Sequence, residues 1–182
     1  MKKCDEIIKF NKKLIYSSPN PQNIHYVEKA WRDVSRTCRG ISEHANEKEE
    51  AKEYISKNFT KLFKSNSQKD FDSKHEKLCD EIIKIIKNDF TYGKAQKFLN
   101  MTLKYYVVDK WDEIKEDEIK FLHSPIDSKI LEYLKEIDNN IRSIKVWSKM
   151  NYDDYYNLQQ VIRKIVKNDE CVFMWELKQF NN

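Results

Sequence analysis

Two residues with the chemistry of a catalytic pair, Lys94 and Asp127, stand where helices are expected to start. In the first turn of a helix, the ammonium group of Lys94 would meet the positive end of the helix dipole, which favours the neutral amine. A neutral amine is a nucleophile that can form a Schiff base, and a nearby carboxylate can move protons or stabilise a cation. The simpler interpretation is that Lys94 is a solvated first-turn residue and Asp127 only a helix cap.

Aromatic side chains in the same half of the chain could form the walls of a site, because aromatic faces stack on planar ligands. Tyr92, Trp147 and Trp175 are the candidate substrate-binding residues, although most aromatic side chains there are expected in the core. His123 directly precedes the segment SPID and is a further candidate, as an acid or base near the pair. A loop histidine with a solvent-facing ring is the alternative.

Basic residues near the pair could contact an anion such as a phosphate group. Residues 91 to 110 contain four lysines against one aspartate, and we take Lys97 and Lys104 as candidate contacts. In the first half of the chain, Arg36 lies in a basic stripe at helical spacing and is a third candidate. A solvated helix face is the alternative for this stripe.

The elements that must position these residues are helices. Between residues 91 and 106 the apolar residues match the full pattern of one buried stripe, so this helix is expected at the centre of the core. No stretch alternates long enough to predict a strand. Helical spacing or composition also predicts helices at 4 to 15, 21 to 39, 43 to 65, 69 to 88, 126 to 137, 152 to 167 and 170 to 180.

Composition agrees with this reading. Only two glycines and three prolines occur in 182 residues, and 35% of the residues are charged, which is typical of helices joined by short polar connections. The sequence predicts an all-α, compact single domain, 1–182, with about seven to nine helices, a charged half at 1–88 and a second half at 89–182. The net charge of +4 permits a nucleic-acid partner without indicating one.

No metal and no cofactor is expected. The histidines are isolated in sequence, and the cysteines form no CxxC pair and have no histidine at ligand spacing, which favours free thiols in a reducing cytosol. The first residues are too polar for a signal peptide, and no apolar run approaches the roughly 20 residues of a membrane span. We therefore expect a cytoplasmic protein without a membrane partner. The cysteines are Cys4, Cys38, Cys79 and Cys171.

The order of the segments TYGKAQKFLNM (91–101) and SPIDSKIL (124–131) resembles the helix-hairpin-helix superfamily of DNA glycosylases. In that superfamily a hairpin leads into a helix that often carries a lysine, and a PVD loop starts the next helix with its aspartate. Lys94 and Asp127 stand 33 residues apart and Phe98 follows Lys94 by four, an arrangement similar to the archaeal 8-oxoguanine branch. The resemblance covers roughly residues 88 to 180.

This resemblance implies an all-α DNA glycosylase, with or without lyase activity, that extrudes a base from double-stranded DNA. It implies Lys94 and Asp127 as catalytic residues and a backbone contact to DNA at Gly93. The usual GxG of the hairpin is reduced here to Gly93, and a register based on Ala95 would put Gly93 at the lysine position. The alternative is a non-catalytic helical binding or regulatory protein that engages a protein partner. The base and the oligomeric state stay open.

Overall fold

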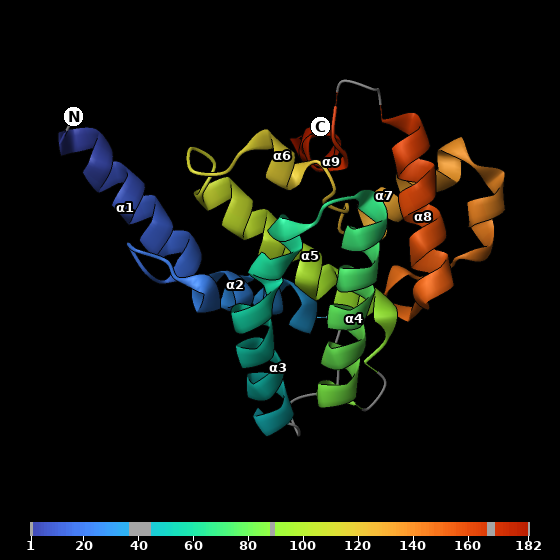
Figure 1. Ribbon diagram of the computed structural model, residues 1–182, viewed down its shortest axis with the longest axis horizontal. Coiled ribbons are helices and arrows are strands. Elements are labelled where there is room, and N and C mark those ends of the chain that lie inside the picture. Colours follow the sequence, from blue (N-terminus) through green and yellow to red (C-terminus); the bar gives the residue numbers. More distant parts are fainter. Residues whose placement is uncertain (1, 37–44, 88–89, 167–169, 182) are drawn as a thin grey trace.

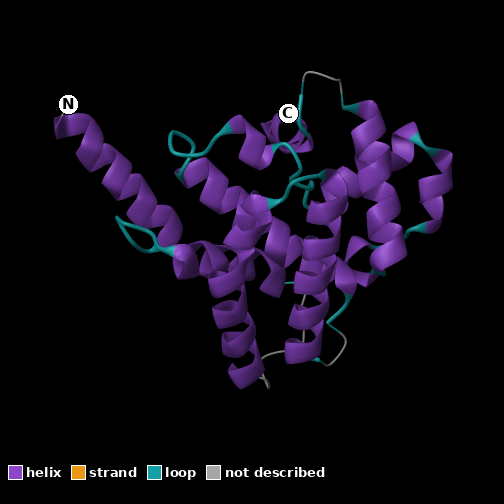
Figure 2. Cartoon of the chain, in the orientation of Figure 1, coloured by secondary structure: helices purple, strands orange, loops and turns teal. Residues whose placement is uncertain are grey.

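A computed structural model describes residues 2 to 36, 45 to 87, 90 to 166 and 170 to 181, and every regular element among them is a helix (Figures 1 and 2). The all-α prediction is confirmed for this part of the chain. The α-helices are α1 (Lys2–Tyr16), α2 (Asn23–Ser35), α3 (Ala45–Asn58), α4 (Gln68–Ile86), α5 (Tyr92–Asp109), α6 (Glu116–Ile119), α7 (Ser128–Ile137), α8 (Tyr152–Ile165) and α9 (Val172–Asn181). Three short 3₁₀ helices accompany them: η2 (Phe59–Lys64), η3 (Asn139–Ser143) and η4 (Trp147–Lys149).

Helix α5 lies at the centre of the molecule, as its apolar stripe predicts. It packs against α2, α4, α8 and η4, and Figure 1 shows it surrounded by elements from both halves of the sequence. Phe98, Leu99 and Leu103 are fully or almost fully buried. The buried apolar side chains of the described residues form one cluster, which extends from Tyr16 to Trp175. The charged first half and the second half therefore share this core.

Side-chain caps explain where several of the helices begin. The hydroxyl of Thr91 accepts a hydrogen bond from the backbone N–H of Lys94 at the start of α5, and Ser67 does the same for Asp70 in α4. At the start of α7 the carboxylate of Asp127 accepts from the N–H of Ile130. Each cap satisfies a backbone donor that has no partner within its helix.

The sequence prediction of one helix over residues 43 to 65 differs from the structure, in which α3 ends at Asn58 and η2 follows. Phe59 and Leu62 are both buried and stand three residues apart, which suits the repeat of a 3₁₀ helix. The short helices η3 and η4 had no counterpart among the predicted elements. The last residues of the helix predicted at 21 to 39, Cys38 among them, lie outside the described residues.

Helix α1 extends away from the body of the molecule (Figure 1). Its apolar residues stand at the spacing that the sequence predicts, yet most of them are exposed. Among the described residues, no helix is both long enough and apolar enough to cross a membrane. Cys79 and Cys171 are free thiols, the first buried and the second partly exposed.

Candidate functional site

Asp127 stands at the end of an extended segment that passes through the core. Residues 122 to 126 are all buried, and they belong to no helix, so their backbone groups need partners from elsewhere. The fully buried amide of Gln96 supplies two of them. Its Nε2 donates to the carbonyl oxygen of Ile126 at 2.8 Å, and its Oε1 accepts from the N–H of Ile126 at 3.2 Å. Gln96 thus grips the residue directly before Asp127.

A second buried glutamine grips the same segment two residues earlier. Nε2 of Gln159 donates to the carbonyl oxygen of Ser124 at 2.8 Å, and its Oε1 accepts from the N–H of Ser124 at 3.2 Å. Between the two gripped residues lies Pro125, which has no N–H to satisfy. The two glutamine amides, one from α5 and one from α8, therefore replace the strand neighbours that an extended segment would otherwise require.

The segment delivers the Asp127 carboxylate to a lysine and an aromatic ring. Oδ2 of Asp127 lies 3.6 Å from Nζ of Lys97, and that Nζ lies 4.6 Å from the ring centroid of Trp147. The Lys97 side chain is 14% exposed and that of Asp127 is 37% exposed, so the group reaches the surface through its carboxylate. An amine, a carboxylate and an aromatic face from three different elements meet at this point.

Gly93 permits the close approach of η4 to α5 that brings Trp147 to the site. A Cβ atom at position 93 would lie 2.1 Å from the carbonyl oxygen of Trp147, so no other residue fits without movement. The N–H of Gly93 donates to the carbonyl oxygen of Met150 at 3.0 Å, and the Thr91 hydroxyl donates to that of Ser148. The backbone N–H that the family resemblance assigned to DNA is therefore occupied by the protein itself.

Behind the extended segment, His123 is buried with both ring nitrogens engaged. Its Nε2 lies 2.8 Å from Oδ1 of Asp72, and Arg163 donates to both oxygens of the same carboxylate at 2.7 and 3.1 Å. Nη2 of Arg163 also lies 2.8 Å from Nε2 of His123. Because Asp72 only accepts, we assign a proton to Nε2 of neutral His123, so that this N–H and the N–H groups of Arg163 all point at Asp72. The contact between Nη2 of Arg163 and Nε2 of His123 is then not a hydrogen bond.

This proton fixes the direction of a chain of hydrogen bonds. Neutral His123 accepts at Nδ1 from the Tyr155 hydroxyl at 2.7 Å, and the Tyr155 oxygen accepts from Nδ2 of Asn100 at 2.8 Å. Oδ1 of Asn100 accepts from Nε2 of His75 at 3.0 Å, and Nδ1 of His75 faces the Cys79 thiol at 3.7 Å. Asn100 also donates to Gln96, which joins this chain to the segment before Asp127. We call these residues, Cys79, His75, Asn100, Tyr155, His123, Asp72 and Arg163, the core network.

Burial and the neighbouring charges set the protonation states in the core network. Burial lowers the pKa of His75 well below its usual value, and the neighbouring His123 lowers it further. Burial also lowers the pKa of His123, against the opposing hydrogen bond to Asp72. For Asp72, burial alone would raise the pKa, but the hydrogen bonds from His123 and Arg163 outweigh it and hold the pKa well below its usual range. Both histidines are therefore neutral beside an ionised aspartate.

His123 thus belongs to the core network and not to a surface pocket, and neither is it a solvent-facing loop residue. Tyr92 and Trp175, the two other aromatic residues predicted to bind substrate, are buried as well. The Tyr92 ring packs edge-on against Tyr152, with centroids 5.4 Å apart, and the Trp175 ring packs against Tyr133 at 5.8 Å.

The predicted anion contacts also have partners within the protein. Nζ of Lys104 is buried and lies 2.9 and 2.8 Å from the two carboxylate oxygens of Glu176 in α9. Burial raises the pKa of Glu176, and Lys104 opposes that shift. Arg36 is exposed beside Asp33 at 3.4 Å, at the end of α2. Lys94 is partly buried in the first turn of α5, one turn before the Lys97 that contacts Asp127.

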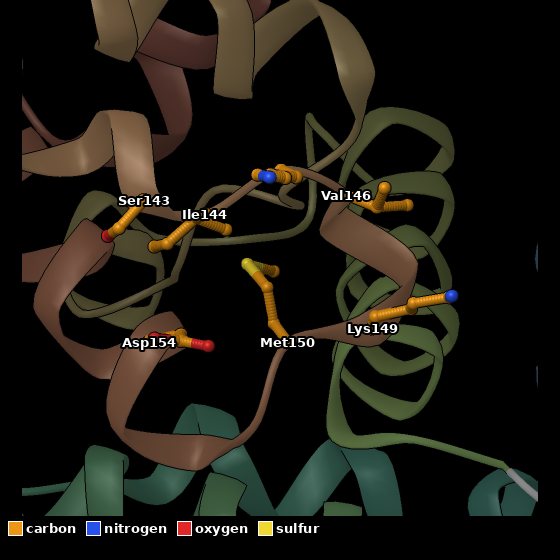
Figure 3. A pocket seen from close by; sticks show the side chains of 7 residues that line it. Ser143, Ile144, Val146, Lys149, Met150 and Asp154 are labelled. Atoms are coloured by element: carbon orange, nitrogen blue, oxygen red, sulfur yellow. The ribbon is translucent and has the colours of Figure 1, made fainter.

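A hollow of about 380 Å³ opens between η3 and the start of α8. Figure 3 shows the Met150 side chain extending toward its centre, with Asp154 on one side and Val146 on the other. Lys145 and Lys149 line the hollow, and the segment from 139 to 150, which supplies most of the lining, also contains Arg142 and no acidic residue. Ile144, Val146 and Met150 therefore give the hollow an apolar wall, and its charged lining residues are two lysines and Asp154.

The sequence did not predict the core network, because His75 stands far from the other histidines in the chain. In the structure the His75 and His123 rings lie 4.7 Å apart. A signal was available, because polar residues recur at helical spacing on the buried faces of three helices. These residues are Asp72, His75 and Cys79 in α4, Gln96, Asn100 and Lys104 in α5, and Tyr155, Gln159 and Arg163 in α8.

Within the described ranges, no group of three or more histidine, cysteine, aspartate or glutamate side chains is arranged to hold a metal ion. Comparison with known proteins adds nothing to this chemistry. The chain matches no protein-family model, no curated protein and no solved structure.

Proposed function

We propose that the chain is a DNA glycosylase in which Asp127 is the catalytic carboxylate and Lys97 supplies the amine. The observation that carries the proposal is the 3.6 Å contact between Lys97 Nζ and Asp127 Oδ2, with Trp147 under the same Nζ at 4.6 Å. The resemblance assigned the amine to Lys94, one helical turn earlier. We assign it to Lys97 because Asp127 contacts this lysine directly.

The proposed reaction uses both groups of the pair. Asp127 accepts a proton from Lys97, and the freed amine attacks C1′ of the sugar as the N-glycosidic bond breaks. The bonding electrons leave with the base, which takes up the proton that Asp127 received. The C1′–O4′ bond of the attached sugar then breaks, O4′ takes up a proton from the attached nitrogen, and the opened sugar remains on Lys97 as a Schiff base. The carboxylate also stabilises positive charge that develops on the sugar. Elimination from the Schiff base would then cut the strand, which is the lyase activity.

Two features support DNA as the substrate. The base must leave the stack of the DNA helix and enter a space with an aromatic or apolar wall, and Ile144, Val146 and Met150 give the hollow an apolar wall. Phosphate groups need cations nearby, and the segment from Arg142 to Lys149 provides three of them without an acidic neighbour in the same segment. Lys97, which the sequence suggested as a phosphate contact, is in this proposal the catalytic amine.

Base release tests the proposal. Duplexes that carry 8-oxoguanine or uracil are incubated with the protein and with Asp127→Asn, which retains a side-chain cap while removing the charge. We expect release by the wild type and a loss of at least about a hundredfold in the variant, the scale of an essential proton-transfer group. Lys129→Gln, at an exposed position of α7, is the matched control and should keep full activity.

A non-catalytic helical binding protein that engages a protein partner is the second candidate. The observation that favours it is that many predicted site residues have internal roles. Gly93, Lys104 and His123 each complete a hydrogen bond or ion pair within the fold. Absence of base release from every damaged duplex, together with unchanged folding, would favour this candidate.

A further inference from the structure

Helix α1 is attached to the body through one narrow edge. Nζ of Lys12 lies 3.2 Å from Asp109, and the Tyr16 hydroxyl donates to the carbonyl oxygen of Tyr105 at 3.2 Å. The Tyr16 ring also packs edge-on against Tyr26, with centroids 5.2 Å apart. Lys12 and Tyr16 stand four residues apart and so lie on the same side of the helix.

The apolar face of α1 points away from this edge. At about 100° per residue, Ile7, Phe10 and Leu14 lie on the side opposite Lys12 and Tyr16. Their exposed fractions are 61%, 61% and 66%. Ile8 and Ile15 lie on the flank and are 45% and 44% exposed. The exposure of each residue therefore follows its angle from the attached edge, and α1 presents an apolar face to the outside. Single exposed apolar residues are ordinary, but three bulky ones gathered on one face of a helix, with two more on its flank, indicate a binding surface.

The size and charge of this face restrict what covers it. At these exposed fractions the five side chains present less surface than three fully exposed residues, which falls short of the roughly 800 Å² per partner that a stable protein interface buries. A symmetric pair of α1 helices is therefore too small a dimer interface. The helix carries five lysines against Asp5 and Glu6, and it remains positive after Asp109 is counted against Lys12.

A basic amphipathic helix with bulky apolar residues on one face is the form that lies in a membrane interface. The sequence led us to expect no membrane partner because no run could span a bilayer, but binding at the surface needs no span. We propose that α1 binds the surface of an anionic lipid membrane, with Ile7, Phe10 and Leu14 inserted among the acyl chains. The body lies on the opposite side of the helix and does not obstruct this contact. The lysines attract anionic headgroups over about 8 Å at physiological salt, which is slightly less than the width of a helix. This proposal is independent of the proposed glycosylase activity.

Sedimentation with lipid vesicles tests the proposal on the full chain. The probes are vesicles of phosphatidylcholine alone and of phosphatidylcholine mixed with phosphatidylglycerol. We expect binding to the mixed vesicles, weaker binding at high salt, and little binding to phosphatidylcholine alone. Leu14→Asp should weaken binding by about tenfold or more, since burying one leucine in hydrocarbon is worth about that factor. Ile137→Asp, at a similarly exposed apolar position of α7, is the control and should bind as the wild type does.

Three results would overturn the proposal. The first is no sedimentation with the mixed vesicles, and the second is equal binding by Leu14→Asp and the wild type. The third is a concentration-dependent dimer in light scattering that Leu14→Asp abolishes, because a second copy of the chain would then cover the face. Circular dichroism and melting temperatures that match the wild type show that each variant is folded, so a loss of binding refers to the surface.

Discussion

Nδ1 of His123 lies 2.7 Å from the Tyr155 hydroxyl, deep in the core, and the contact holds a single proton. Tyr155 supplies that proton when His123 is neutral. If Nδ1 of His123 also carried a proton, that N–H and the Tyr155 O–H would point at each other. The Tyr155 hydrogen would then have to turn away from His123, while its oxygen already accepts from Asn100. His75 is held in the same way, with Nε2 committed to Asn100. The core network is therefore complete only when both rings are neutral.

Stability should fall as the pH is lowered through the range of histidine. The pKa values of His75 and His123 are lowered in the folded state, so the unfolded chain takes up these protons first when the pH falls below about 6.5. Below that pH, each histidine that stays neutral in the folded protein should lower the free energy of unfolding by about 1.4 kcal/mol for each pH unit of acidification. The lowered pKa of Asp72 acts in the same direction, but below about pH 4.

Urea unfolding between about pH 7.5 and about pH 5.5 measures this slope. Nuclear magnetic resonance of the ring protons provides the control, because two histidine rings should not titrate in the folded protein over this range. A flat stability profile, or titration of both buried rings near pH 6.5 in the folded state, would contradict the assigned network.

Substitution of Gln159, which binds the backbone of Ser124, should lower the free energy of unfolding far more than substitution of the neighbouring Gln160. Gln159→Leu leaves the buried N–H and carbonyl of Ser124 without partners, and we expect a loss of about 2 to 4 kcal/mol in unfolding free energy. Gln160→Leu changes the same residue type at the next, partly exposed position and should cost less than about 0.5 kcal/mol. Equal effects of the two variants would mean that the clamp does not stabilise the segment.

Gly93→Ala should destabilise the protein although alanine favours helices. The added Cβ would lie 2.1 Å from the carbonyl oxygen of Trp147, so η4 must move away from α5, at a cost of roughly 1 to 3 kcal/mol. Lys129→Ala, on the exposed side of α7, should stay within about 0.5 kcal/mol of the wild type. Chemical denaturation compares the two, and a stabilised Gly93→Ala protein would refute the close contact.

Leu103 and Leu14 provide a direct comparison of the core with the exposed arm. Leu103→Ala empties a buried site in α5 and should cost roughly 2 to 5 kcal/mol. Leu14→Ala changes an exposed residue of α1 and should change the stability by less than about 0.5 kcal/mol. A small effect at Leu103 would place α5 outside the core, and a large effect at Leu14 would mean that α1 is covered in the isolated protein.

The helices could be predicted from the sequence because their apolar spacing is a local property. The stripe around Phe98 and Leu103 identifies α5 as central, and the apolar run after residue 128 indicates that Asp127 or Ser128 caps a helix, of which the structure has Asp127. Both features depend on residues a few positions apart, which share a helix face or a helix end.

The pairing within the site could not be predicted, because it depends on how distant elements pack. Lys94 and Lys97 both lie near the start of α5, and the contact of Lys97 with Asp127 follows from the position of the gripped segment. Likewise, Asp72 and Arg163 are far apart in the sequence, and no local pattern indicates that they share His123. The apolar face of α1 predicts a helix correctly, but it does not reveal whether the face lies inward or outward.

Trapping with borohydride tests the central proposal most directly, because reduction converts a Schiff base into a stable covalent bond at the amine that formed it. The protein is mixed with a duplex carrying an abasic site, reduced and digested, and the modified peptide is mapped by mass spectrometry. We expect the adduct on Lys97, its loss in Lys97→Gln, and its retention in Lys129→Gln. An adduct on Lys94 would refute the assigned amine, and the absence of any adduct with abasic, 8-oxoguanine or uracil duplexes would contradict the Schiff-base reaction itself.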